Sequence, residues 1–210
     1  MNRKNKKTAA KSTRNRLRSK NILLESVGNI LAQRSYSELN VTSLTEISGL
    51  NPKLIYLYFG GLEGLIAQYL ENRELQPSAA QKLSQNIALH PKDVVHEDIL
   101  SLLEIQLDEL IADDELKGIL HWGFSAKNLK AIATLQMHER TLQKALDILK
   151  VNQNIGSNFD SVAFALLAAG ATFLAIQSKN NKSSLLNVDL HDEHERKRIK
   201  DVLQRLLVSP

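Results

Sequence analysis

Apolar residues recur at spacings of three and four along nearly the whole of this 210-residue chain. Between residues 19 and 33 they form a single stripe, which consists of Ile22, Leu23, Val27, Ile30 and Leu31. This period predicts helices that each bury one face, and no strand-like alternation persists. We therefore expect an all-α fold. The expected helices cover residues 19–33, 41–48, 52–59, 62–74, 78–88, 93–111, 115–123, 126–151, 159–178 and 191–207.

Two of the expected helices are short and are joined by a tight turn at 49–51, which reads Gly-Leu-Asn. Asn40 is a good N-cap for the first helix, because its side chain can accept hydrogen bonds from the amides of the first turn. Asn51 can cap the second helix, and Pro52 suits its first position, where no amide hydrogen is needed. Two short helices at this spacing predict a helix-turn-helix over residues 40–59.

The second helix of this pair has the division that a recognition helix needs: an apolar side that fixes its angle and a polar start that can enter the major groove. Its inward side would consist of Leu50, Leu54, Ile55 and Phe59. The residues left to face DNA are Asn51, Pro52, Lys53, Tyr56 and Leu57. Hydroxyl and ammonium groups suit phosphate oxygens, which fix the register on DNA, whereas base edges specify the sequence. The pattern therefore predicts double-stranded DNA as a partner.

The segment at 44–66, LTEISGLNPKLIYLYFGGLEGLI, resembles the signature of the TetR family of transcriptional regulators, which reads roughly IAxxAGVSxGTLYxYFxSKExLL. The resemblance extends over residues 19–66, and its most specific matches are Gly49, Tyr56, Tyr58, Phe59 and Glu63. It implies a three-helix DNA-binding domain followed by a helical domain that binds an effector and dimerises. We therefore expect a basic flexible arm at 1–18, a DNA-binding domain at 19–66, and an effector-binding and dimerisation domain at 67–210.

The resemblance also implies roles for single residues. Tyr56 and Tyr58 match positions that contact backbone phosphates, and Lys53 matches the base-facing start of the recognition helix. Thr42 matches a position that can reach a base or a phosphate. Two of these residues have a simpler alternative role: Tyr56 could belong mainly to the core, and Thr42 could be a plain first-turn residue. Two roles are open for Leu57, which could be merely exposed or could contact a thymine methyl group.

One departure from the family pattern removes an expected phosphate contact, because the usual lysine at the start of the fourth helix is Leu62 here. Residues 1–20 carry nine basic side chains and no acid; because the whole chain carries +4, the rest carries −5. Such a basic segment suits a polyanion, although it could also be a solubilising tail. We expect it to replace the lost phosphate contact, by entering the minor groove or lying along the phosphates. The residues concerned are Arg14, Arg16, Arg18 and Lys20.

The segment at 159–176, FDSVAFALLAAGATFLAI, is almost entirely apolar and so needs burial on all sides. We expect a second copy of the chain to supply that burial, which makes a homodimer; the alternative is a core helix of a monomer. The resemblance implies dimerisation through the last two helices. A two-fold dimer would present two recognition helices about 34 Å apart, as a palindromic operator requires. The predicted interface residues are Phe164, Ala168, Ala171, Leu174, Leu203 and Leu206.

A small apolar or aromatic effector is expected in the C-terminal half, where few charged residues fall at interior positions. The candidate pocket residues, each of which could instead belong to the core or the surface, are His121, Trp122, Phe124, Met137 and His138. The leading hypothesis is a repressor that the effector releases from its operator. The alternative is a TetR-like architectural or interaction protein that binds DNA without a small-molecule effector.

Features missing from the sequence exclude other classes. The chain has no cysteine, which excludes disulfides and thiolate zinc sites. It has no glycine-rich phosphate loop, nucleophile elbow or paired-carboxylate motif, so we expect neither enzyme activity nor a cofactor. His191 and His194 could hold a metal, but an acidic, solvated first helical turn is the simpler interpretation. No apolar run reaches the roughly 18–20 residues of a membrane span, and no secretory signal is apparent, so we expect a cytoplasmic, nucleoid-associated protein.

Overall fold

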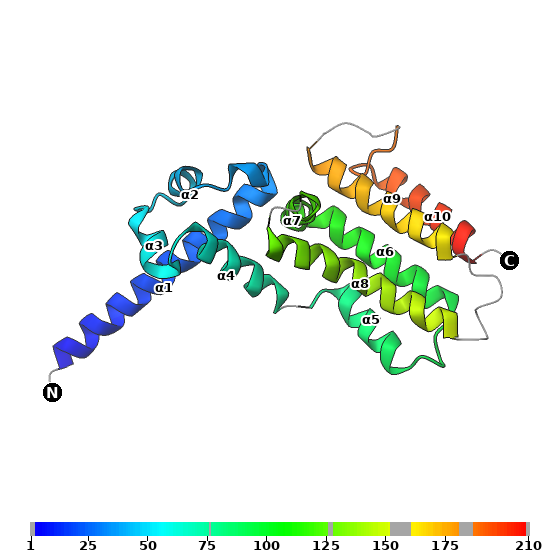
Figure 1. The fold of residues 1–210 in the computed structure, drawn as a ribbon, viewed down its shortest axis with the longest axis horizontal. Coiled ribbons are helices and arrows are strands. Elements are labelled where there is room, and N and C mark those ends of the chain that lie inside the picture. The colour runs from blue at the N-terminus through cyan, green and yellow to red at the C-terminus, as the bar shows by residue number, and fades with distance from the viewer. Residues whose placement is uncertain (1–2, 76, 126–127, 152–160, 181–186, 209–210) are drawn as a thin grey trace. The chain divides into compact units, whose positions relative to one another are not determined.

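The computed structural model describes residues 3–75, 77–125, 128–151, 161–180 and 187–208. These residues form helices joined by short connections, which confirms the predicted all-α fold class (Figure 1). The chain divides into two compact units, an N-terminal unit at Met1–Leu75 and a C-terminal unit at Gln76–Pro210. The division falls after the fourth helix, so that helix belongs wholly to the N-terminal unit.

The N-terminal unit contains α1 (Arg3–Gln33), the short 3₁₀ helix η1 (Tyr36–Glu38), α2 (Val41–Ser48), α3 (Lys53–Phe59) and α4 (Leu62–Glu74). Helices α2 to α4 lie where the sequence predicts them. Helix α1 packs against each of them, and the buried part of its predicted stripe consists of Leu23, Val27, Ile30 and Leu31. The same core receives Leu44, Ile55 and Leu65 from α2, α3 and α4.

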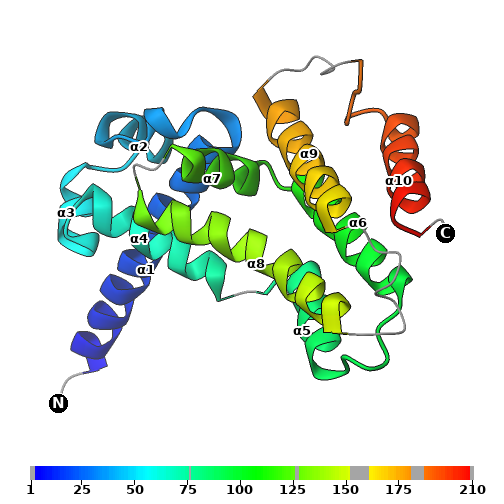
Figure 2. The same ribbon diagram turned by 45° about the vertical axis from the view of Figure 1, so that its right-hand side comes forward.

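Helix α1 is longer than its apolar stripe predicts. It begins at Arg3 rather than near Ser19, so the expectation of a flexible arm at 1–18 is wrong for the described residues from 3 onward. This part of the chain is rich in Lys and Arg and has neither Gly nor Pro, which favours a helix even without an apolar face. Its first half extends beyond α2, α3 and α4 within the unit (Figures 1 and 2).

The C-terminal unit contains α5 (Ala79–Leu89), α6 (His96–Ala112), α7 (Asp114–Phe124), α8 (Leu129–Val151), α9 (Ser161–Asn180) and α10 (Glu193–Val208). All six helices were expected from the sequence, with ends that differ by a few residues. Helix α6 is central, because it packs against each of the other five (Figure 2). Asp113 caps α7, since its Oδ1 accepts a hydrogen bond of 2.8 Å from the amide of Leu116.

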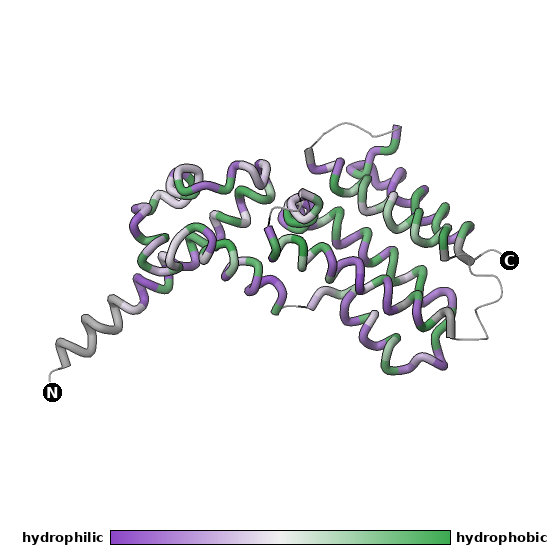
Figure 3. The backbone as a smooth tube through the Cα atoms, in the orientation of Figure 1, coloured by the Kyte–Doolittle hydropathy of each residue, from purple (hydrophilic) through white to green (hydrophobic). Residues whose placement is uncertain are grey.

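The core of the C-terminal unit consists of two apolar clusters that follow one another along α6. The first cluster includes Leu102 and Leu103 of α6, with Leu142, Phe164, Ala168 and Leu203. The second cluster includes Leu107 and Leu110 of α6, with Leu120, Leu135, Ala171 and Ala175. Each of the helices α6, α8 and α9 contributes to both clusters, and hydrophobic stretches recur along these helices in Figure 3.

Helix α9 corrects one expectation from the sequence. Among the described residues, its stretch Val162–Lys179 is long and apolar enough to cross a membrane, with a mean hydropathy of 1.5. The statement that no apolar run reaches this length is therefore wrong. A single such helix is weak evidence for a span, because a core helix has the same composition. One face of α9 does pack in the core, through Phe164, Ala168, Ala171 and Ala175.

Candidate nucleic-acid interface

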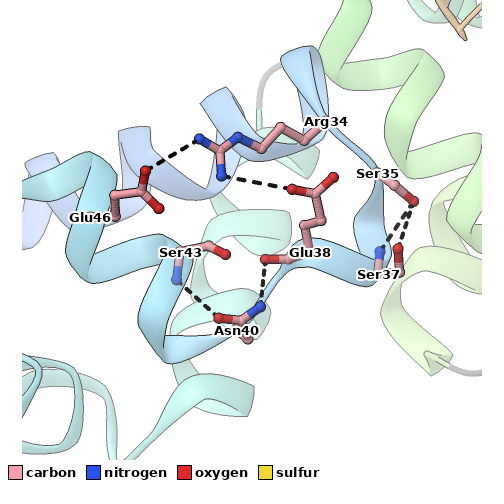
Figure 4. A network of polar contacts seen from close by, with 7 residues as sticks. All are labelled: Arg34, Ser35, Ser37, Glu38, Asn40, Ser43 and Glu46. Atoms are coloured by element: carbon pink, nitrogen blue, oxygen red, sulfur yellow. Dashed lines mark hydrogen bonds and ion pairs between the residues drawn. The ribbon is translucent and has the colours of Figure 1, made fainter.

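The start of α2 is held by a polar network that also includes the end of α1 (Figure 4). Asn40 Oδ1 accepts a hydrogen bond of 2.9 Å from the amide of Ser43, and Asn40 Nδ2 donates one of 3.1 Å to the carbonyl oxygen of Glu38. The guanidinium of Arg34 lies 3.7 Å from the Glu38 carboxylate and 3.9 Å from that of Glu46. Asn40 is thus the N-cap that the sequence predicts, and Arg34 ties α1 to both η1 and α2.

The turn between α2 and α3 has the backbone that its residues predict. Gly49 adopts a φ of 64°, the left-handed conformation that ends a helix and that a side chain would strain. Asn51 Oδ1 accepts a hydrogen bond of 2.9 Å from the amide of Lys53, and Pro52 already has helical angles of −57° and −26°. Asn51 is therefore the functional cap of α3, with Pro52 in its first turn. Gly60, with a φ of 75°, ends α3.

The inner side of α3 is fixed by α1 and α4. Ile55 is fully buried, whereas Leu50, Leu54 and Phe59 are half-buried. A Cβ atom added to Gly64 would lie 1.8 Å from the carbonyl oxygen of Phe59, so the end of α3 sits directly on the first turn of α4. Sequence reasoning did not single out Gly64, although a glycine inside a predicted helix is a signal of close backbone approach.

The outer side of this helix-turn-helix carries the predicted contact residues. Tyr56 is 60% exposed and Leu57 is 69% exposed, so the alternative that places Tyr56 mainly in the core is wrong. The other exposed members of the predicted set are Thr42, Asn51, Pro52 and Lys53. Together these residues give the two short helices one accessible polar and aromatic surface, which we call the α3 face.

Two basic residues of α1 lie against the aromatic residues of α3. The guanidinium carbon of Arg16 is 5.5 Å from the ring centroid of Tyr58, and the Lys20 ammonium is 5.3 Å from that of Phe59. Both are within the range of attraction between a cation and an aromatic ring. Since Arg16 and Lys20 are four residues apart, they share one face of α1. Tyr58 is therefore half-buried beneath Arg16, an arrangement that sequence reasoning missed.

The predicted effector residues lie on α7 and α8. Trp122 is buried at the end of α7, Met137 is half-buried, and both His121 and Phe124 are exposed. A closed cavity within one copy would therefore not be lined by His121 or Phe124. His138 of α8 has an inaccessible Nε2 atom and lies beside a residue that the sequence reasoning missed.

That residue is Gln106 of α6, whose side chain is buried. Its Nε2 atom lies 2.8 Å from His138 Nδ1 and 3.1 Å from the carbonyl oxygen of His138. Burial lowers the pKa of His138 from 6.5 to about 4, because the charged ring would lose its hydration. The available signal was the position of Gln106 in an otherwise apolar stripe of α6, which consists of Leu102, Leu103, Leu107 and Leu110.

The predicted dimer residues need correction. Phe164, Ala168, Ala171 and Leu203 are each at most 7% exposed within a single chain, because they face the core clusters. Leu174 is half-buried and Leu206 is 59% exposed. The exposed large apolar residues of α9 lie on another side of the helix and are Val162, Leu166 and Phe173, which are 66%, 70% and 53% exposed. We call these three residues the outer α9 face.

The fold of this chain is similar to one solved structure, that of the fatty acid degradation regulator FadR from Bacillus halodurans. The alignment covers 90% of this chain and 98% of that chain. The TM-score is 0.51 and the sequence identity is 15%, so the likeness shows a shared fold. No family model matches the chain, and no curated protein sequence matches it.

Proposed function

We propose that this protein is a sequence-specific DNA-binding transcriptional regulator of the TetR type. The observation that carries the proposal is the α3 face: a short helix, capped at both ends, packed inward by Ile55 and with Lys53, Tyr56 and Leu57 exposed. A recognition helix requires this arrangement, because its angle in the major groove is set by packing and its readout by exposed side chains. The resemblance of residues 19–66 to the family and the fold shared with FadR support it.

We assign phosphate and base contacts within the α3 face. Lys53 and Tyr56 extend from the start and middle of α3, and Thr42 extends from the first turn of α2. Arg16 holds a positive charge beside Tyr58, which positions both groups for one phosphate. The basic residues of α1 would then lie along the DNA backbone as a helix, since a helix cannot follow the minor groove as an extended arm does.

We assign the outer α9 face to a second copy of the chain. Val162, Leu166 and Phe173 are spaced four and seven residues apart, so they form one stripe, and α10 adds the exposed Val202 and Leu206. Apolar stripes of this kind mark association surfaces. A two-fold contact between two copies would present one α3 face to each half-site of a palindromic operator.

In the proposed mechanism the dimer represses transcription by occupying the operator, and a small effector bound in the C-terminal unit releases it. The dimer has one conformation that fits the operator and another that fits it poorly. The effector can shift this equilibrium only if it binds more tightly to the conformation that fits the operator poorly. The contact between buried Gln106 and half-buried His138 in the C-terminal unit is the observation that favours an effector-binding regulator over an architectural DNA-binding protein.

Selection of bound sequences from a pool of random DNA tests this function. The full-length protein should enrich a palindromic sequence whose half-sites are centred about one helical turn apart, ~34 Å, or a multiple of it. Enrichment of no sequence, together with uniform weak binding to all DNA, would overturn the proposal. Repeating the selection with candidate effectors distinguishes a repressor that an effector releases from a DNA-binding protein without a small-molecule effector.

A further inference from the structure

The outward side of α3 carries a leucine. Leu57 is 69% exposed, although the buried Ile55 lies only two residues before it. Two residues correspond to about 200° around a helix axis, so Leu57 points almost directly away from the core of the N-terminal unit. Lys53 precedes Leu57 by four residues and is also exposed, so these two side chains form one outward ridge of α3.

The direction of this ridge determines which part of a DNA duplex it can contact. A helix that is seated in the major groove presents its outward ridge to the base edges, while residues beside the ridge contact the phosphates. Tyr58, which is half-buried beneath Arg16, lies off the ridge and suits a phosphate contact. Leu57 follows Lys53 along the ridge and therefore meets base edges.

The charge around Leu57 favours DNA as the molecule that covers it. No acidic residue occurs between residues 47 and 62. Lys53 is exposed on the ridge, and Arg16 and Lys20 of α1 lie against aromatic rings of α3. These positive charges attract a polyanion. An apolar side chain among them suits a polyanion that also presents apolar groups.

The base edges in the major groove differ in what they offer a leucine. Guanine, adenine and cytosine present hydrogen-bond donors and acceptors there, whereas thymine also presents its 5-methyl group. A leucine side chain can neither donate nor accept a hydrogen bond, so it would remove water from a polar edge without replacing the lost hydrogen bonds. Against the methyl group of thymine it buries apolar surface, which is favourable.

We propose that Leu57 is a specificity-determining residue that packs on the 5-methyl group of one thymine in each half-site of the operator. This inference rests on the proposed function and adds the chemical group that α3 recognises. The recognised group is a methyl group at a fixed position of the major groove. A base that carries a methyl group at the same position, such as 5-methylcytosine, should therefore replace thymine in this contact.

The test removes that methyl group from the DNA. The probe is the duplex palindrome that the full-length protein enriches most from random DNA. Each thymine of a half-site is replaced in turn by uracil, symmetrically in both half-sites, and the affinity is measured by titration. At one position the replacement should weaken binding about fifteenfold, since one buried methyl group contributes about fourfold in each half-site. With cytosine at that position, methylation of its C5 atom should strengthen binding by the same factor.

Two leucine variants show whether Leu57 makes the contact. Leu57→Ala should bind the thymine and uracil duplexes equally at that position, with an unchanged circular dichroism spectrum because the side chain is exposed. Leu89→Ala removes a leucine that is 75% exposed at the end of α5 and should keep the fifteenfold ratio. Because each ratio is taken within one protein, any effect of uracil on the DNA itself cancels between the variants.

Four results would overturn the inference while the proposed function stands. They are a selected half-site without thymine, uracil replacements that leave the affinity unchanged, equal binding of cytosine and 5-methylcytosine at the sensitive position, and a fifteenfold ratio that persists in Leu57→Ala. In each case the protein still binds its selected palindrome. Enrichment of no sequence from random DNA would instead contradict the proposed function, and this inference with it.

Discussion

At the scale of single residues, the side chains of α3 have two roles. Those that face outward are placed to contact DNA, and those that face inward support the fold. Lys53 is exposed at the start of α3, whereas Ile55, two residues later, is fully buried. We expect Lys53→Ala to weaken operator binding about tenfold, in the range of one lost phosphate or base contact. The melting temperature should not change, since surface substitutions stay within about 0.5 kcal/mol. Titration with labelled operator DNA measures the affinity, and the matched control is Lys82→Ala on α5. Equal affinities of the two variants would show that the assigned face is wrong.

His138 predicts a pH dependence of stability. Its pKa is about 4 in the folded protein and 6.5 as a free side chain, so the unfolded chain binds more protons between these values. Stability is therefore complete above pH 6.5 and falls as the pH drops towards 4. Between pH 7 and pH 5 the free energy of unfolding should fall by about 2 kcal/mol because of His138. Urea unfolding of the wild type and His138→Phe at both pH values isolates this contribution; an equal loss in both proteins would contradict it.

At the scale of elements, the contact between α3 and α4 depends on a glycine. Gly64→Ala places a Cβ atom 1.8 Å from the Phe59 carbonyl oxygen, so the two helices must move apart. We expect a loss of about 1–3 kcal/mol of stability, as for overpacking, together with weaker DNA binding. Thermal unfolding and a binding titration measure the two effects. Gln68→Ala, at an exposed position of the same helix, is the control and should change neither. An unaltered melting temperature in Gly64→Ala would show that α4 does not set the position of α3.

The basic half of α1 makes a second prediction at this scale. Arg14 and Arg18 are exposed, and each should neutralise one phosphate if α1 lies along the DNA. The double variant Arg14→Gln/Arg18→Gln should reduce the slope of log affinity against log salt concentration by about 2. Lys82→Gln/Lys197→Gln removes the same charge from exposed positions of α5 and α10 and should leave the slope unchanged. Equal slopes for both double variants would remove α1 from the interface.

The helices themselves were largely predictable from the sequence, and the failures have physical reasons. The stripe of Leu23, Val27, Ile30 and Leu31 and the caps at Asn40 and Asn51 are local signals, and all of them appear in the structure. The first half of α1 was missed because a solvated helix needs no apolar period. The Gln106–His138 contact joins residues that lie 32 positions apart, and no local pattern reports such a contact.

At the scale of the whole molecule, the direction in which α9 faces decides how two copies could associate. Of the α9 residues predicted for the interface, Phe164, Ala168 and Ala171 face the core of their own chain, since a helix that is apolar all round does not show which face its own core takes. Leu166→Asp on the outer α9 face should weaken the dimer at least about thirtyfold, as for a central interface residue, and leave the fold intact. Ala168→Asp, two residues away but 7% exposed, should unfold the C-terminal unit instead. Sedimentation and circular dichroism distinguish the two outcomes; an unchanged oligomeric state of folded Leu166→Asp would place the interface elsewhere.

The proposed regulator combines a two-copy assembly with an α3 face in each copy, so its central claim concerns DNA with two half-sites. The most direct measurement compares the affinity of the full-length protein for a selected palindrome with its affinity for the same DNA carrying one scrambled half-site. We predict that scrambling weakens binding by about a hundredfold or more, the cost of several mismatched base pairs, with two chains bound per palindrome. Equal affinity for the intact, half-scrambled and fully scrambled DNA would contradict sequence-specific recognition by the α3 face.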